Sequence, residues 1–116
     1  MQPEYRDRAY LWDILEAARD IKEFIQDLSF DQFAEDKKTR FAVERQLLAI
    51  GEAANHVSDS FRKLHPEIPW KQIIGQRNVI AHEYGEVLVE RIWFTAKENI
   101  PELIENVQKN LPDNEY

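Results

Sequence analysis

Apolar residues recur every three or four positions along most of the chain, and this spacing limits the fold to helices. One stripe lies between about residue 4 and residue 28 and consists of Leu11, Ile14, Leu15, Ala18, Ile21, Ile25 and Leu28. A second stripe consists of Val43, Leu47, Ile50, Ala54, Val57, Phe61 and Leu64. This spacing puts the apolar side chains on one helix face, and no segment alternates as a strand would. The sequence therefore predicts an all-α protein.

Capping residues and prolines mark the expected helix ends. Ser29 and Gln32 form a capping-box pattern, which predicts a short helical turn through Phe33. The second stripe can break near Ser58, and it must end at Pro66 because the proline ring cannot continue helical hydrogen bonding.

The C-terminal half of the chain carries two further helical patterns. Pro69 suits the first position of a helix that we expect over residues 70–84, with Gly85 as its C-terminal cap. A last helix is expected from Val87 onward, and Pro101 either kinks it or starts a second segment. Its apolar residues are Leu88, Ile92, Phe94, Ile100, Leu103, Ile104 and Val107. The prediction is a bundle of four to five helices.

The length and composition favour one soluble domain over residues 1–116. The chain has 43% hydrophobic and 32% charged residues, and it lacks a repeat or a flexible linker. No apolar run approaches the roughly 20 residues that span a membrane, and the N-terminus lacks the apolar core of a signal peptide, so we expect a cytoplasmic protein without membrane contact. The net charge of −7 disfavours broad, nonspecific binding to nucleic acid.

Metal and thiol chemistry find little support in the sequence. The chain has no cysteine, which removes disulfides, thiol nucleophiles and cysteine zinc sites. His56, His65 and His82 lack the spacing of a metal-binding motif, so neither a metal nor a cofactor is expected. Glu52 and His56 are four residues apart and can form a surface pair, a dimer contact or part of a site.

The stretch QRNVIAHEYG, residues 76–85, sets charged and titratable groups among apolar residues. On a regular helix Arg77 and Tyr84 fall on the same stripe as Ile73, which predicts that both face the core. A buried guanidinium is costly unless it is paired, and Glu52 is the nearest candidate counter-ion.

His82 occupies a different part of the same helix. Asn78 and His82 are four residues apart and lie side by side, whereas Arg77 and His82 point about 140° apart on an ideal helix. Arg77 and His82 can converge only if the arginine extends toward the histidine, the helix distorts or a second subunit contributes.

These residue types suit the cleavage of RNA. Imidazole transfers protons near neutral pH, and guanidinium can hold a phosphate through two hydrogen bonds. The 2′-hydroxyl of RNA supplies an internal nucleophile, so a base, an acid and a cation suffice without a metal. Composition alone still favours a structural interpretation, because cations are common at helix C-termini and tyrosines at core edges.

A family resemblance changes that balance. The segment RNVIAHEY resembles the R-x4-H-x-Y motif of the HepT-like toxins in the HEPN superfamily, the ribonuclease halves of HEPN/MNT toxin-antitoxin pairs. Residues 47–85, with their IGEAA and PEIPW segments, resemble the central block of that family, and IWFTAKENIPEL resembles its C-terminal helix. The resemblance covers most of the chain.

The resemblance implies a homodimeric HEPN-like bundle whose motif residues meet at a cleft between subunits. It also implies metal-independent cleavage of RNA with Arg77 and His82 at the catalytic positions. We add two supporting residues as hypotheses of our own, Asn78 as a positioning donor and Glu52 as the counter-ion of Arg77. The implied partner is an MNT-type nucleotidyltransferase antitoxin, which transfers AMP onto the motif tyrosine, Tyr84. The alternative function is a non-catalytic helical module that binds a nucleotide or a protein, which the acidic net charge would suit.

Overall fold

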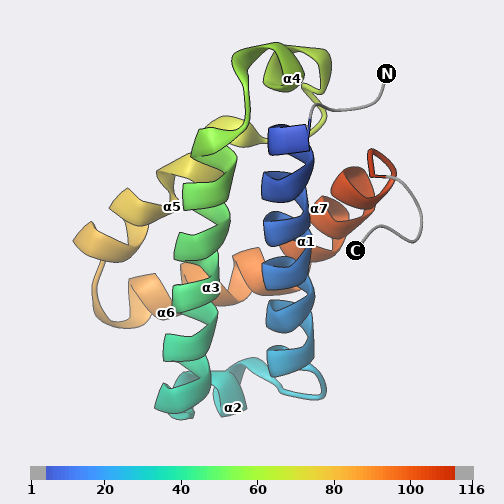
Figure 1. Cartoon of the computed structure of the whole chain (residues 1–116). Helices are drawn as coiled ribbons and strands as arrows, with labels where there is room; N and C mark the ends of the chain where they lie inside the picture. The colour runs from blue at the N-terminus through green and yellow to red at the C-terminus, as the bar shows by residue number, and fades with distance from the viewer. Residues whose placement is uncertain (1–4, 112–116) are drawn as a thin grey trace.

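The computed structural model describes residues 5–111, and every regular element among them is helical (Figure 1). The elements are α1 (Tyr5–Ile25), α2 (Phe30–Glu35), α3 (Lys37–His56), α4 (Asp59–Leu64), α5 (Trp70–His82), α6 (Gly85–Phe94), the π-helix η1 (Thr95–Asn99) and α7 (Ile100–Gln108). The all-α prediction is confirmed. Because α6, η1 and α7 follow one another without a break, the described residues form six continuous helices, one more than the upper expectation. None of these helices is long and apolar enough to span a membrane.

The long helices α1 and α3 lie side by side at the centre of the molecule (Figure 1). Their predicted stripes form most of the core, and Leu11, Ile14 and Val43 are almost fully buried. The helix α1 ends at Ile25 rather than near residue 28, because Asp27 adopts a left-handed backbone conformation with φ of 66°. Aspartate is among the few residues that tolerate this conformation, and it ends the helix.

Side-chain caps fix the two helix starts that follow. The predicted capping box is present, because Ser29 Oγ accepts from the Gln32 amide at 3.1 Å while Gln32 Oε1 accepts from the Ser29 amide at 2.9 Å. Asp36 caps α3 and accepts from both the amide and the hydroxyl of Thr39, at 3.0 and 2.6 Å. These hydrogen bonds from Thr39 lower the pKa of Asp36.

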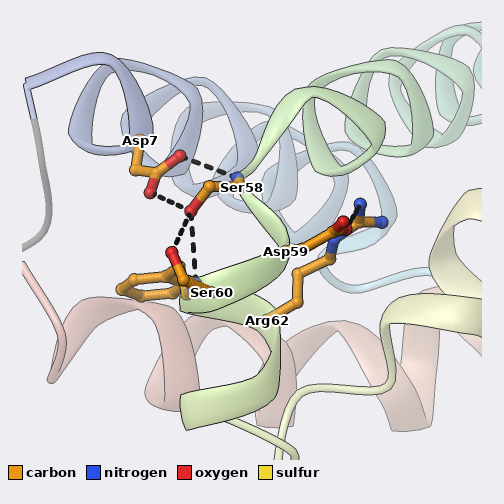
Figure 2. A network of polar contacts seen from close by, with 6 residues as sticks. Asp7, Ser58, Asp59, Ser60 and Arg62 are labelled. Carbon is orange, nitrogen blue, oxygen red and sulfur yellow. Dashed lines mark hydrogen bonds and ion pairs between the residues drawn. The ribbon is translucent and has the colours of Figure 1, made fainter.

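The predicted break near Ser58 is confirmed, and a buried carboxylate holds it in place. Asp7 of α1 is 4% exposed and accepts from the amide of Ser58 at 2.8 Å and from its hydroxyl at 2.6 Å (Figure 2). Ser58 Oγ in turn accepts from the Phe61 amide and caps α4. The junction between α3 and α4 is therefore tied to the first turn of α1, and this fixes where the chain turns toward α5.

The helix α5 approaches α3 closely because α3 carries a glycine at the crossing. A Cβ atom added at Gly51 would lie 2.9 Å from the carbonyl oxygen of Ile73, closer than real contacts allow. Ile73 is buried at this crossing, and Trp70 anchors the start of α5 by donating its indole N–H to the His65 carbonyl at 2.9 Å.

Pro101 starts a second segment of the last helix, which was one of its two predicted effects. It is the second residue of α7, the helix that follows the π-helix η1 directly. Proline has no N–H to donate to the preceding turn. The preceding turn is widened, and the amide of Ile100 bonds to the carbonyl of Thr95, five residues earlier.

Candidate functional site

The motif residues lie on the second half of α5, where the helix leaves the core. Only Trp70 and Ile73 of this helix are buried, and Arg77, Asn78 and His82 are all exposed. In Figure 1 the C-terminal end of α5 projects away from the central helices. The motif is therefore presented on the surface of the chain and not inside the bundle.

The prediction that Arg77 and Tyr84 face the core is wrong. The Arg77 side chain is 68% exposed, and Tyr84 is 77% exposed. The helical spacing failed for two physical reasons. The helix α5 packs on α3 mainly through its first half, and it ends at His82, so Tyr84 lies beyond the helix on extended backbone.

Gly85 is not the C-terminal cap of α5. Glu83 takes that position, with its amide bonded to the Val79 carbonyl at 3.0 Å, and Gly85 is the first residue of α6. The chain reverses direction across residues 83–85, and Gly85 adopts a φ of 62° there. Glycine tolerates that backbone conformation without strain, so the residue is needed at the turn, although not as the cap that its position suggested.

Arg77 forms the predicted ion pair with Glu52. Arg77 Nη1 lies 3.2 Å from Glu52 Oε2, and the other carboxylate oxygen of Glu52 lies 3.4 Å from His56 Nε2. The His56 ring stacks on Tyr10 of α1, with ring centroids 5.2 Å apart and planes 20° apart. These four residues, Arg77, Glu52, His56 and Tyr10, form a continuous line of contacts across α5, α3 and α1, which we call the Arg77–Tyr10 row. Glu52 and His56 thus form a surface pair within the chain.

His82 lies apart from this row. It occupies the last turn of α5, is exposed, and has no hydrogen-bond partner among residues 5–111. Asn78, one turn earlier, is exposed as well. A single chain therefore pairs Arg77 with Glu52 and leaves His82 open to solvent.

Two grooves adjoin the motif helix. The first has a volume of about 920 Å³ and lies between α5 on one side and α6, η1 and α7 on the other. Its lining includes Val87 and Phe94, which are 53% and 59% exposed. The second groove, of about 720 Å³, lies between α1 and α3 and is lined by Arg77 and by the rest of the Arg77–Tyr10 row.

The three histidines occupy separate environments. His56 belongs to the Arg77–Tyr10 row, whereas His65 lies against Phe61 and has Nδ1 3.2 Å from a carboxylate oxygen of Glu67. His82 is at the end of α5. Within the described part of the chain, no group of three or more histidine and acidic side chains is arranged to hold a metal ion.

Sequence reasoning did not identify Tyr10 and Arg45 as part of this region. Both line the second groove, Tyr10 from α1 and Arg45 from α3. Helical periodicity shows that each lies off the buried stripe, but it does not give the register of α1 against α3. That register is what brings Tyr10 onto His56.

Comparisons with known proteins identify the family to which the chain belongs. A protein of Thermococcus cleftensis named as a probable ribonuclease HepT is 45% identical over 89% of this chain and 92% of its own length. Two proteins of Methanocaldococcus jannaschii, whose names describe them as candidate RNases, are 38% and 37% identical over 87% and 96% of this chain, and over 93% and 92% of their own lengths. The chain has no significant match among solved structures.

The family model described as ribonuclease HepT-like matches residues 14–110, which include α5 and the whole R-x4-H-x-Y motif. The chain therefore belongs to the HepT-like ribonuclease family.

Proposed function

We propose that this protein is a metal-independent ribonuclease that uses Arg77 and His82, and that it is the toxin of a toxin-antitoxin pair. Membership of the HepT-like ribonuclease family supports the reaction class, as do the relatives that carry ribonuclease names. The observation that carries the proposal is the exposure of Arg77 and His82 on the projecting end of α5.

The ion pair with Glu52 leaves Arg77 able to bind a phosphate. Both side chains of the pair are more than half exposed, and exposed ion pairs contribute only about 0–1 kcal/mol. A phosphate that accepts two hydrogen bonds from the guanidinium can therefore replace the single contact with Glu52. Glu52 holds the Arg77 guanidinium beside α3 until the substrate arrives.

The reaction divides between the two motif residues. His82 removes the proton of the 2′-hydroxyl, the 2′-oxygen attacks the adjacent phosphorus, and the bond to the 5′-oxygen breaks. The leaving 5′-oxygen takes up a proton from water, and the product is a 2′,3′-cyclic phosphate. Arg77 stabilises the negative charge that builds on the nonbridging oxygens, and Asn78 donates a hydrogen bond that positions the phosphate.

A homodimer would complete this site. One chain keeps Arg77 paired with Glu52 and holds His82 apart from it at the end of α5, whereas the reaction needs both side chains at the same phosphate. The first groove and its exposed apolar residues, Val87 and Phe94, offer a surface for a second copy next to the motif helix. A two-fold axis there would place two copies of Arg77 and His82 along one cleft.

Tyr84 is the proposed point of control by an MNT-type nucleotidyltransferase antitoxin. Its ring is 77% exposed and extended backbone holds it between α5 and α6, so an enzyme can reach the phenol. Transfer of AMP onto the phenol oxygen would add a negative phosphodiester and a bulky nucleoside near the motif. This group would compete with RNA for Arg77.

Incubation of the purified protein with RNA in the presence of EDTA tests the proposal. We expect cleavage that leaves cyclic-phosphate ends and falls by at least about 100-fold in Arg77→Ala and His82→Ala, because each removes one element of catalysis. Lys71→Ala removes an exposed cation from the first turn of the same helix and should leave cleavage unchanged. Undiminished cleavage by His82→Ala would show that His82 is not a catalytic residue.

The acidic net charge of −7 favours one second candidate, a non-catalytic module that binds a nucleotide or a protein. In that case the unsubstituted protein cleaves no RNA at any concentration while it still binds its ligand at the motif helix. The EDTA experiment separates the two candidates.

A further inference from the structure

The groove between α1 and α3 is large enough to hold a small ligand. Its volume of about 720 Å³ falls within the range of ligand sites, roughly 300–1,000 Å³. Three alanines, Ala17, Ala49 and Ala53, are among the residues that line it, and Ala17 and Ala53 are buried where the two helices pack together. A hydrogen bond of 3.0 Å from Gln46 Nε2 to Asp20 joins α3 to α1 farther along the same groove.

At one end of the groove, beside Arg77, an aromatic ring is fixed in place by its neighbours. Tyr10 covers one face of the His56 ring, and Glu52 contacts its Nε2 atom. The His56 side chain is nevertheless 50% exposed, so the ring remains accessible to a ligand. Planar rings fixed in this way are surfaces on which nucleobases stack.

The groove has an arginine toward each of its two ends and carboxylates between them. Arg77 of α5 contacts Glu52 of α3 at one end of the groove. Arg45 lies two turns before Glu52 on α3, about 10 Å away along the helix axis. Between these two cations α1 contributes the exposed carboxylates of Asp13 and Glu16, which have no hydrogen-bond partner among residues 5–111. Arginines can hold phosphates, whereas carboxylates repel phosphates and accept hydrogen bonds from N–H groups.

We propose that this groove binds one nucleotide of an RNA substrate next to the bond that is cut, and that Asp13 and Glu16 select a base with an exposed amino group. This inference rests on the proposed function, because Arg77 connects the groove to the scissile phosphate. Cytosine, adenine and guanine carry amino groups that a carboxylate can accept from, whereas uracil has no amino group and presents a carbonyl oxygen where cytosine has one. Stacking on His56 and Tyr10 would hold any base, and the carboxylates would distinguish between bases.

Binding to the full chain carrying His82→Ala tests the groove without interference from cleavage. The probes are four short, fluorescently labelled RNAs that differ at one nucleotide, and anisotropy gives their Kd values. We expect the uracil probe to bind about ten-fold more weakly than the other three. Adding Asp13→Asn and Glu16→Gln should bring the four affinities together, because the amides remove the charged acceptors.

Control variants separate the groove from the rest of α1. Glu23→Gln removes an exposed carboxylate of α1 that does not line the groove, and it should leave the preference intact. Tyr10→Ala should weaken all four probes about ten-fold by releasing the stacked platform, whereas Tyr10→Phe keeps the ring and should bind as the parent does.

Two results would overturn the inference. One is equal affinity for the four probes, or a preference that survives Asp13→Asn with Glu16→Gln. The other is tight binding of an arginine-rich peptide that is lost in the same double variant while RNA binding is unchanged, which would make the groove a docking surface for a basic protein segment. Failure of the unsubstituted protein to cleave RNA would overturn the proposed function instead, because the binding experiment does not depend on cleavage.

Discussion

Asp7, a residue outside the motif, ties the junction between α3 and α4 to α1. It is the only charged or polar residue found buried among residues 5–111, and both of its oxygens accept hydrogen bonds from Ser58. Asp7→Ala leaves the Ser58 amide without this partner, which should lower the free energy of unfolding by about 1–3 kcal/mol in urea titrations. Asp7→Asn keeps one acceptor oxygen and should lose less. Equal stability of all three proteins would show that solvent replaces the carboxylate.

Asp36 makes the stability of α3 depend on pH. The hydrogen bonds from Thr39 lower the pKa of Asp36 in the folded protein below its ordinary value, so the charged carboxylate stabilises the fold. This contribution is complete above the unfolded-state pKa and is lost as the pH falls through the lower folded-state value. Asp36→Asn keeps a capping oxygen without the charge. Its deficit in unfolding free energy against the unsubstituted protein should be constant at neutral pH and vanish in acid, and a deficit independent of pH would contradict this account.

At the scale of the elements, helical periodicity predicted where helices exist better than which of their faces is buried. The stripes of α1 and α3 are correct because both helices are packed along their length. The stripe through Ile73, Arg77 and Tyr84 failed because α5 is packed only at its start and ends before Tyr84. Local signals, such as the Ser29 capping box and the break near Ser58, were reliable since they depend on neighbouring residues. The pairing of Arg77 with Glu52 could be anticipated from charge, but the Tyr10–His56 stack could not.

The crossing of α3 and α5 should be the element contact to which the site is most sensitive. Gly51→Ala places a methyl group 2.9 Å from the Ile73 carbonyl, so α5 must move away from α3 and carry Arg77 away from Glu52. We expect a loss of about 1–3 kcal/mol in unfolding free energy and a several-fold weaker apparent affinity for RNA. Gly75→Ala is the matched control, because a Cβ atom there meets nothing within 4 Å. If both variants behave alike, the close approach does not position Arg77.

At the scale of the whole molecule, Arg77 and His82 are separated, and the single chain does not explain how both could act on the same phosphate. Arg77 lines the groove between α1 and α3, whereas His82 lies outside it at the end of α5. Helical spacing alone indicated that the two side chains diverge. It could not show whether a second subunit brings the two side chains together, because the residues of a dimer surface do not recur at helical spacing in the sequence. The proposed homodimer makes a specific prediction about sharing of the site.

Mixing two inactive variants tests that sharing. Arg77→Ala and His82→Ala chains, unfolded together in equal amounts and refolded, should form mixed dimers in about half of the molecules. If Arg77 of one copy acts with His82 of the other, each mixed dimer retains one intact site, and the mixture should recover about a quarter of the unsubstituted activity. If both residues must come from the same chain, no combination is intact and the mixture stays inactive.

Refolding the unsubstituted protein by the same procedure controls for recovery, and size-exclusion chromatography of each sample reports whether dimers have formed. An inactive mixture that elutes as a dimer would therefore place the reaction within one chain, and Arg77 would then have to leave Glu52 and reach around α5 to act with His82.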